Sequence, residues 1–171
     1  MGYTTEFEGQ FNLDRPLTPE QAAYLRAFAG SRRMKRDASK TAELDDPQRV
    51  AVGLPVGTDG EFYVGTDWGR PTYGQTRTDD IVDYNSPPST QPSLWCQWVP
   101  TDDNKGIEWD GGEKFYSYVE WLNYIIANFL KSWGYTLNGE VTWEGEDRDD
   151  LGKIVVTDNE VTTKEGKVVY D

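Results

Sequence analysis

The segment from Glu113 to Trp133 constrains the fold more than any other part of the chain. Its apolar side chains recur at steps of three and four residues, the spacing of one face of an α-helix. They are Phe115, Tyr118, Val119, Leu122, Ile125, Ile126, Phe129, Leu130 and Trp133. A helix with such a face must cover another apolar surface. We therefore expect one long amphipathic helix over residues 113–133, ended by Gly134.

Short strands supply the surface that this helix would cover. Segments of alternating or β-branched and aromatic residues predict strands at 3–13, 62–65, 94–99, 107–109, 137–143, 153–157, 160–163 and 167–170. The pairs Asp158-Asn159 and Glu165-Gly166 are typical of hairpin turns. The fold class that we expect is α+β, with a mostly antiparallel sheet and the long helix packed on it.

A shorter N-terminal helix is expected over residues 19–30. Thr18 is a good N-cap, Pro19 suits the first helical position, and Gln21 can close a capping box. We expect the 171 residues to form a single domain. Residues 66–92 are rich in Gly, Pro, Thr and Asp and poor in aliphatic residues. They predict a long irregular loop, which in a compact domain is usually either functional or mobile.

The negative charge is unevenly distributed along the chain. The net charge is −13, yet residues 1–50 hold eight basic and eight acidic side chains, and the excess falls entirely in the remainder. Such a surface repels nucleic-acid backbones and anionic lipid, and it attracts basic proteins. We therefore expect a basic protein partner, no direct nucleic-acid binding and no membrane contact. The basic run Ser31–Arg36 is the local exception, interpreted either as a solvated helix end or as a phosphate contact.

The composition excludes several chemistries. Without histidine there is no Ser–His–Asp triad, no imidazole proton shuttle and no His-ligated metal. The single cysteine, Cys96, forms no intrachain disulfide, and lone thiols favour a cytoplasmic location. The N-terminus has neither the basic nor the apolar part of a signal peptide. We assign no catalytic residue, and we expect no cofactor and no dedicated metal site.

The acidic run between two predicted strands is the strongest candidate site. It contains Glu144, Glu146, Asp147, Asp149 and Asp150. Clustered carboxylates can bind a basic partner, can hold Mg²⁺ or Ca²⁺, or can form a solvated turn. The run fits no EF-hand loop, because the residues at the fifth and twelfth positions are wrong.

Aromatic residues form a second candidate set. Trp121 falls outside the main apolar stripe of the long helix, and Trp68 and Tyr73 lie in the irregular loop. Exposed aromatic side chains with acidic neighbours are common in protein–protein hot spots and in sugar sites. The alternative is that the helix is buried on two sides.

Several stretches carry a resemblance to known proteins. They are Asp14–Glu20, Leu94–Pro100, Glu108–Phe115 and Leu137–Glu146. With these stretches the chain resembles a group of small acidic bacterial and phage proteins of unassigned function. The resemblance covers most of the chain outside residues 67–91. It implies a cytoplasmic, phage-borne context, and it brings no catalytic residues.

Three hypotheses of function follow from the sequence. The first is a non-catalytic interaction protein that binds, and in a stronger form inhibits, a basic nucleic-acid-handling partner through the acidic run and the three aromatic residues. The second is a carboxylate-based enzyme that depends on a divalent metal, using the acidic run with Asp79, Asp80 and Asp83. The third is a small-ligand or sugar binder built on the exposed aromatic side chains.

Overall fold

The computed structural model describes residues 2–66 and 77–170, and the chain divides into two compact units. The first unit combines Met1–Pro16 with Gln97–Asp171, and the second is Leu17–Cys96. The architecture is α+β with a mostly antiparallel sheet, as expected.

The first unit holds 19 acidic and eight basic residues, whereas the second holds 11 acidic and nine basic residues. Most of the charge imbalance therefore lies in the first unit, whose net charge is −11 against −2 in the second. That both units form one domain stays a prediction.

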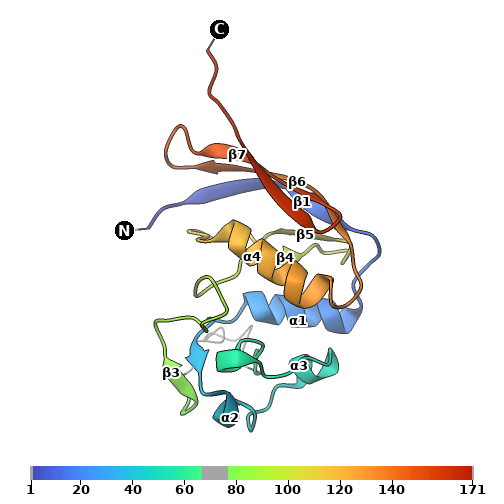
Figure 1. The fold of residues 1–171 in the computed structure, drawn as a ribbon, viewed down its shortest axis with the longest axis vertical. Coiled ribbons are helices and arrows are strands. Elements are labelled where there is room, and N and C mark those ends of the chain that lie inside the picture. Colours follow the sequence, from blue (N-terminus) through green and yellow to red (C-terminus); the bar gives the residue numbers. More distant parts are fainter. Residues whose placement is uncertain (1, 67–76, 171) are drawn as a thin grey trace. The chain divides into compact units, whose positions relative to one another are not determined.

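The first unit contains a six-stranded sheet in the order β4-β5-β1-β6-β7-β8. Every neighbouring pair of strands is antiparallel. The strands are β1 (Thr5–Leu13), β4 (Trp98–Pro100), β5 (Gly106–Trp109), β6 (Leu137–Gly145), β7 (Leu151–Thr157) and β8 (Glu160–Glu165). The N-terminal strand β1 lies near the middle of this sheet, between β5 and β6 (Figure 1).

The two faces of this sheet differ because side chains alternate along each strand. On β1, Phe7, Phe11 and Leu13 are buried while the residues between them are exposed. Val141 on β6 and Ile154 on β7 are directly opposite each other and continue the buried face. The sheet therefore has one apolar face and one face in contact with solvent, the usual pattern of an antiparallel sheet.

The helix of the first unit begins later than its apolar pattern predicts. We expected helix from residue 113, but α4 spans Tyr118–Ile125 and continues as a π-helical turn at Ile126–Leu130. Lys114 and Ser117 both have positive φ angles, of 58° and 57°, and such left-handed residues interrupt a helix.

Phe115 is consequently not a helical residue but part of an aromatic cluster. Its ring lies 5.8 Å from that of Phe7 and 5.3 Å from that of Trp98, both on the sheet. Tyr118, the first residue of α4, has its ring 4.9 Å from Phe7, and its carbonyl accepts a hydrogen bond from Trp98 Nε1 at 2.8 Å. These contacts join the start of α4 to the apolar face, along which the helix runs (Figure 1).

The C-terminal strands follow the predicted meander up to its last element. Asp158 and Asn159 have φ angles of 49° and 71° and form the two-residue turn between β7 and β8, as expected. The strand predicted at 167–170 is wrong, because the chain after β8 is irregular. Val168, Val169 and Tyr170 are exposed there, so their apolar side chains lack the buried face that a strand in this position requires.

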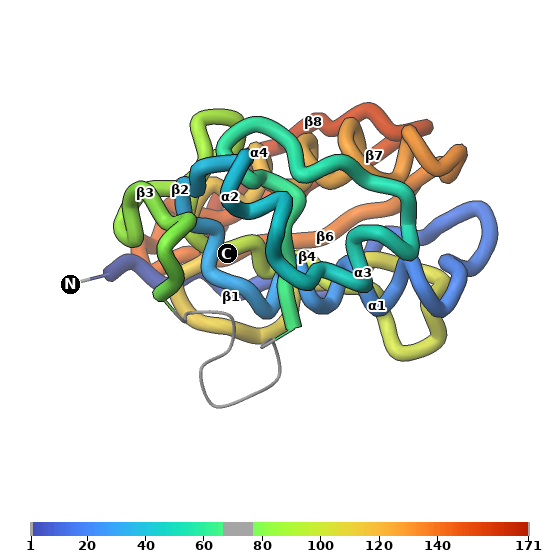
Figure 2. The backbone as a smooth tube through the Cα atoms, turned by 90° about the horizontal axis from the view of Figure 1, so that it is seen from below, coloured from blue at the N-terminus to red at the C-terminus, as the bar shows by residue number. Residues whose placement is uncertain are grey.

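The second unit is built from short elements. They are α1 (Pro19–Ala29), β2 (Lys35–Arg36), α2 (Ala38–Thr41), α3 (Pro47–Ala51), a 3-10 turn (Thr58–Gly60) and β3 (Ile81–Asp83). The capping box at the start of α1 is present. The strand predicted at 62–65 is absent. Strand β2 pairs with β3, and the two lie side by side in Figure 2. Part of the segment predicted as an irregular loop, β3, thus forms a strand.

Candidate partner-binding surface

Glutamates point outward from the solvent face of the six-stranded sheet. Glu6 and Glu8 lie on β1, and Glu140 and Glu144 lie on β6; all four side chains are exposed. Glu108, half-buried on β5, joins the same face through its register with β1. We call these five residues the acidic face. They lie together because directly opposite residues of an antiparallel pair share a face.

Two of these glutamates directly oppose one another. Glu6 pairs with Glu144 in the register of β1 and β6, and neither forms a salt bridge with any described residue. Glu140, by contrast, is bound by Lys153 Nζ at 3.3 Å. Like charges directly opposite each other destabilise a sheet. The repulsion between Glu6 and Glu144 therefore lowers the stability of the sheet, and the fold does not need it.

A hollow of about 680 Å³ lies between two rows of outward side chains on this face. The rows that line it are Glu6, Glu144 and Leu151 on one side, and Glu8, Thr142, Lys153 and Lys164 on the other. Its floor is the backbone of the intervening row, whose side chains point to the apolar face. The lining is acidic over β1 and β6, whereas over β7 and β8 it contains Lys153, Lys164 and Glu165, so a cationic side chain fits at the end over β1 and β6.

The acidic loop, residues 146–150 between β6 and β7, is held in place by Asp150. One oxygen of this carboxylate accepts a hydrogen bond from Trp143 Nε1 at 2.9 Å, and the other accepts one from Tyr3 Oη at 2.7 Å. Tyr3 Oη in turn accepts a hydrogen bond from the backbone N–H of Asp147 at 2.9 Å. Both carboxylate oxygens of Asp150 are therefore engaged, and its role is to fix the loop.

The other predicted acidic residues remain exposed. Glu146, Asp147 and Asp149 are exposed in the loop, and Glu144 is the residue before the last one of β6. Glu146 Oε1 accepts a hydrogen bond from the backbone N–H of Thr4 at 2.9 Å, which keeps the loop beside the start of β1. The structure therefore brings together the acidic residues that the sequence singles out, and it joins them to the acidic face.

The predicted aromatic residues do not join this surface. Trp68 and Tyr73 lie outside the described residues. Trp121 is completely buried, with its ring in edge contact with Tyr124 at 5.4 Å. Its expected role as an exposed anchor is therefore wrong. The helix buries this side as well as its main apolar stripe, which is the alternative that the sequence left open.

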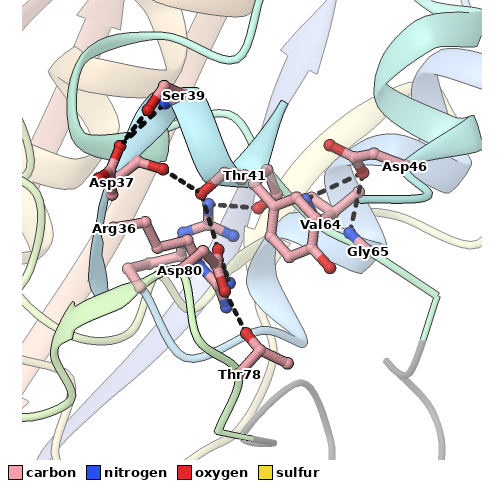
Figure 3. Close-up of polar contacts among 11 residues, drawn as sticks. Arg36, Asp37, Ser39, Thr41, Asp46, Val64, Gly65, Thr78 and Asp80 are labelled. Atoms are coloured by element: carbon pink, nitrogen blue, oxygen red, sulfur yellow. Dashed lines mark hydrogen bonds and ion pairs between the residues drawn. The ribbon is translucent and has the colours of Figure 1, made fainter. Parts of the chain in front are cut away.

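The aspartates that favoured a metal-dependent enzyme do not converge. Asp80 is buried, and its carboxylate binds Arg36 Nη1 at 2.7 Å, Thr41 Oγ1 at 2.7 Å and the hydroxyl of Thr78 (Figure 3). Asp83 accepts hydrogen bonds within its own turn, and the neighbouring Asp79 is exposed. Over residues 2–66 and 77–170, no three His, Cys, Asp or Glu side chains are placed to hold a metal ion.

Two of the four cationic residues in the basic run, Arg33 and Arg36, are buried in the second unit. Arg33 is buried, and it donates hydrogen bonds to the carbonyls of Glu61 and Tyr63 at 2.9 and 2.6 Å. Arg32 stacks on Tyr84, with 4.3 Å from Cζ to the ring centroid. Arg36 is buried against Asp80. Helix α1 ends before the run, so the interpretation as a solvated helix end is wrong, and the phosphate contact stays a prediction.

Sequence reasoning missed the acidic face. The signal was the two-residue spacing of Glu6 and Glu8 and the four-residue spacing of Glu140 and Glu144, both of which keep glutamates on one face of a strand.

No helix among the described residues is long and apolar enough to cross a membrane. Comparison of the chain with protein-family models, with curated proteins and with solved structures found no match.

Proposed function

We propose that this chain is a non-catalytic acidic protein that binds, and by binding inhibits, a basic protein that handles nucleic acid. The observation that supports this most is the unneutralised pair of Glu6 and Glu144, at the end of the acidic face that adjoins the acidic loop. A sheet that keeps opposed carboxylates loses stability through their repulsion. A partner that supplies cationic groups between them turns that repulsion into binding energy.

The spacing of the charges supports the same function. Two residues along a strand span roughly 6.8 Å, and adjacent strands lie about 4.8 Å apart. Both distances are shorter than the Debye length of about 8 Å at physiological salt, so the carboxylates act on a partner together. A groove that binds phosphates by their negative charge attracts such an array in the same way. The acidic loop at 146–150 extends the array beyond the strand ends.

The hollow gives the partner a defined contact. At its acidic end lie Glu6, Glu8 and Glu144, with the apolar side chain of Leu151 beside them. A lysine or arginine of the partner packs its aliphatic stem on Leu151 and places its charge among the carboxylates. In this proposal, α4 stands for the long amphipathic helix that the sequence predicts, and it packs on the apolar face of the sheet, opposite the acidic face. The cell compartment is the cytoplasm of a bacterium, and the gene is carried by a phage, as the resemblance implies.

Capture from a bacterial lysate tests the proposal. The immobilised chain should retain a basic protein at low salt and release it when DNA is added. The released protein should bind DNA less well as free chain is added back. The variant Glu6→Gln with Glu144→Gln should retain less of it, because its opposed carboxylates are gone.

A matched variant separates the acidic face from net charge. Glu20→Gln with Glu43→Gln removes the same number of charges from exposed positions of the second unit. It should capture as much as the unmodified chain. The proposal would be contradicted if both variants lost the same amount of captured protein. It would also be contradicted if the chain captured no basic protein at low salt, or if DNA did not displace the captured protein.

A further inference from the structure

The two edges of the six-stranded sheet differ in their ability to pair. At one edge, β4 is three residues long and ends in Pro100, which has no N–H to donate. At the other edge, β8 is six residues long, and its side chains are exposed apart from the half-buried Val161. An exposed edge strand presents unpaired N–H and C=O groups to another chain. The β8 edge is therefore the open one.

The backbone direction along β8 follows from its pairing with β7. The N–H of Gly166 donates to the carbonyl of Leu151 at 2.8 Å. Because this direction alternates along an antiparallel strand, the even-numbered residues of β8 bond to β7. Val161, Thr163 and Glu165 therefore direct their N–H and C=O groups away from the sheet. These are the groups that a neighbouring strand can reach.

We propose that a second copy of this chain pairs with β8 in antiparallel fashion, about a two-fold axis at Thr162. In this register Thr162 faces its own copy, and Val161 faces Thr163 of the second copy. Val161 and Thr163 both direct their backbone groups away from β7. Each Val161–Thr163 pair across the interface therefore forms two hydrogen bonds. The two sheets become one continuous sheet, and the contact is self-complementary, as a two-fold interface requires.

Charge complementarity selects this occupant. The register places Glu160 opposite Lys164 of the second copy, and Lys164 opposite Glu160 of the second copy. Within one chain, Lys164 lies directly opposite Lys153, a like-charge pair. A glutamate of the second copy beside Lys164 adds an attractive neighbour that offsets this repulsion.

Neighbouring registers lack this match. An axis at Val161 sets Glu160 against Thr162, an axis at Thr163 sets Lys164 against Thr162, and an axis at Lys164 sets that residue against its own copy. An axis that falls between two residues places a residue whose backbone groups point away from β7 opposite one whose groups point towards β7. Such a pair forms no hydrogen bonds between the two copies. Thr162 is the axis position that satisfies the backbone direction and also pairs Glu160 with Lys164.

A groove beside the β7–β8 turn accommodates one more contact. It has a volume of about 430 Å³, and its lining includes Lys131, Asn159 and Val161. In the proposed register, Glu165 of the second copy comes opposite Asn159. Its side chain points to the same face as Val161, towards Lys131. This adds an opposite-charge pair at each end of the interface.

The test is the molecular mass of the full chain in solution, measured by sedimentation over a range of concentrations at low salt. The unmodified chain should form a dimer. Glu160→Lys alone or Lys164→Glu alone places like charges opposite each other twice, and each should raise the dissociation constant by about tenfold or more. The double variant Glu160→Lys with Lys164→Glu restores both pairs and should dimerise like the unmodified chain.

Two further variants keep the result interpretable. Thr163→Pro removes an N–H that β7 does not use, so it should leave the fold intact by circular dichroism and abolish the dimer. Glu43→Lys makes the same charge change as Glu160→Lys at an exposed site in the second unit, and it should leave the dimer intact. A chain that is monomeric at all concentrations, or a double variant no better than the single ones, would overturn the proposal.

Discussion

Removing the carboxylate of Asp80 should destabilise the second unit more than any exposed substitution. The side chain of Asp80 is 2% exposed and that of Arg36 is 7% exposed, and they are 2.7 Å apart. The variant Asp80→Ala leaves the guanidinium of Arg36 buried without its counter-charge. It also removes the acceptor of the hydroxyls of Thr41 and Thr78. Breaking a buried pair from one side typically costs about 3–5 kcal/mol, which is the loss in unfolding free energy that we expect.

Urea unfolding followed by circular dichroism measures this loss, with Asp79→Ala as the matched control. Asp79 is exposed, so its replacement should change the unfolding free energy by no more than about 0.5 kcal/mol. The double variant Arg36→Met with Asp80→Leu removes both charges, and it should cost less than Asp80→Ala alone. A loss below about 1 kcal/mol for Asp80→Ala, the typical worth of one ordinary hydrogen bond, would refute the reasoning.

The same carboxylate makes stability depend on pH. Burial alone raises the pKa of Asp80, but the hydrogen bonds from Thr78, Thr41 and Arg36 outweigh it and hold the pKa below the ordinary value of 3.8. A carboxyl with a lowered pKa contributes stability above its unfolded pKa, and that contribution is lost as the pH falls through the folded value. The gap in unfolding free energy between the unmodified chain and Asp80→Ala should therefore narrow below pH 3.8.

Three further predictions concern the first unit. Glu144→Lys should raise the unfolding free energy by about 0.5–1 kcal/mol, because it turns the repulsion with Glu6 into attraction; a loss in urea unfolding would contradict this. Burial, with smaller contributions from nearby carboxylates, raises the pKa of Tyr118 to about 12, so the difference in alkaline absorbance between the unmodified chain and Tyr118→Phe should have its midpoint there. The stability from the neutral phenol is complete below pH 10 and is lost as the pH rises through 12. Ile125→Ala should cost about 2–5 kcal/mol and Glu120→Ala at most about 0.5 kcal/mol, since only the former is buried; equal losses in urea unfolding would count against the placement of α4.

Sequence patterns predicted correctly those elements that depend on residues close together in the chain. The capping box at Thr18 and the turn at Asp158 and Asn159 depend on residues close together in the chain, and both are present. The predicted helix start was wrong because the periodicity continues through Phe115, whose side chain belongs to the sheet cluster. Periodicity alone does not distinguish an apolar residue on a helix from one packed just before it.

The candidate site was predicted only in part, because its assembly depends on long-range pairing. The acidic loop is visible as a run of adjacent letters, whereas Glu6 and Glu144 are 138 positions apart and meet only through the pairing of β1 with β6. Likewise, Arg36 is a member of a basic run in the sequence, and only the fold shows that Asp80 neutralises it. Strand order is a property of the whole chain, and composition carries no record of it.

The association rate of the captured basic protein tests the central claim most directly, measured while the salt concentration rises. The Debye length shrinks from roughly 30 Å at 0.01 M to about 8 Å at 0.15 M, so the rate for the unmodified chain should fall steeply. The variant with Glu6, Glu8 and Glu144 all changed to Gln should associate slowly at low salt and depend little on salt. The variant with Glu20, Glu43 and Asp45 changed to their amides should behave like the unmodified chain. Identical rates for the two variants at every salt concentration would contradict a role for the acidic face.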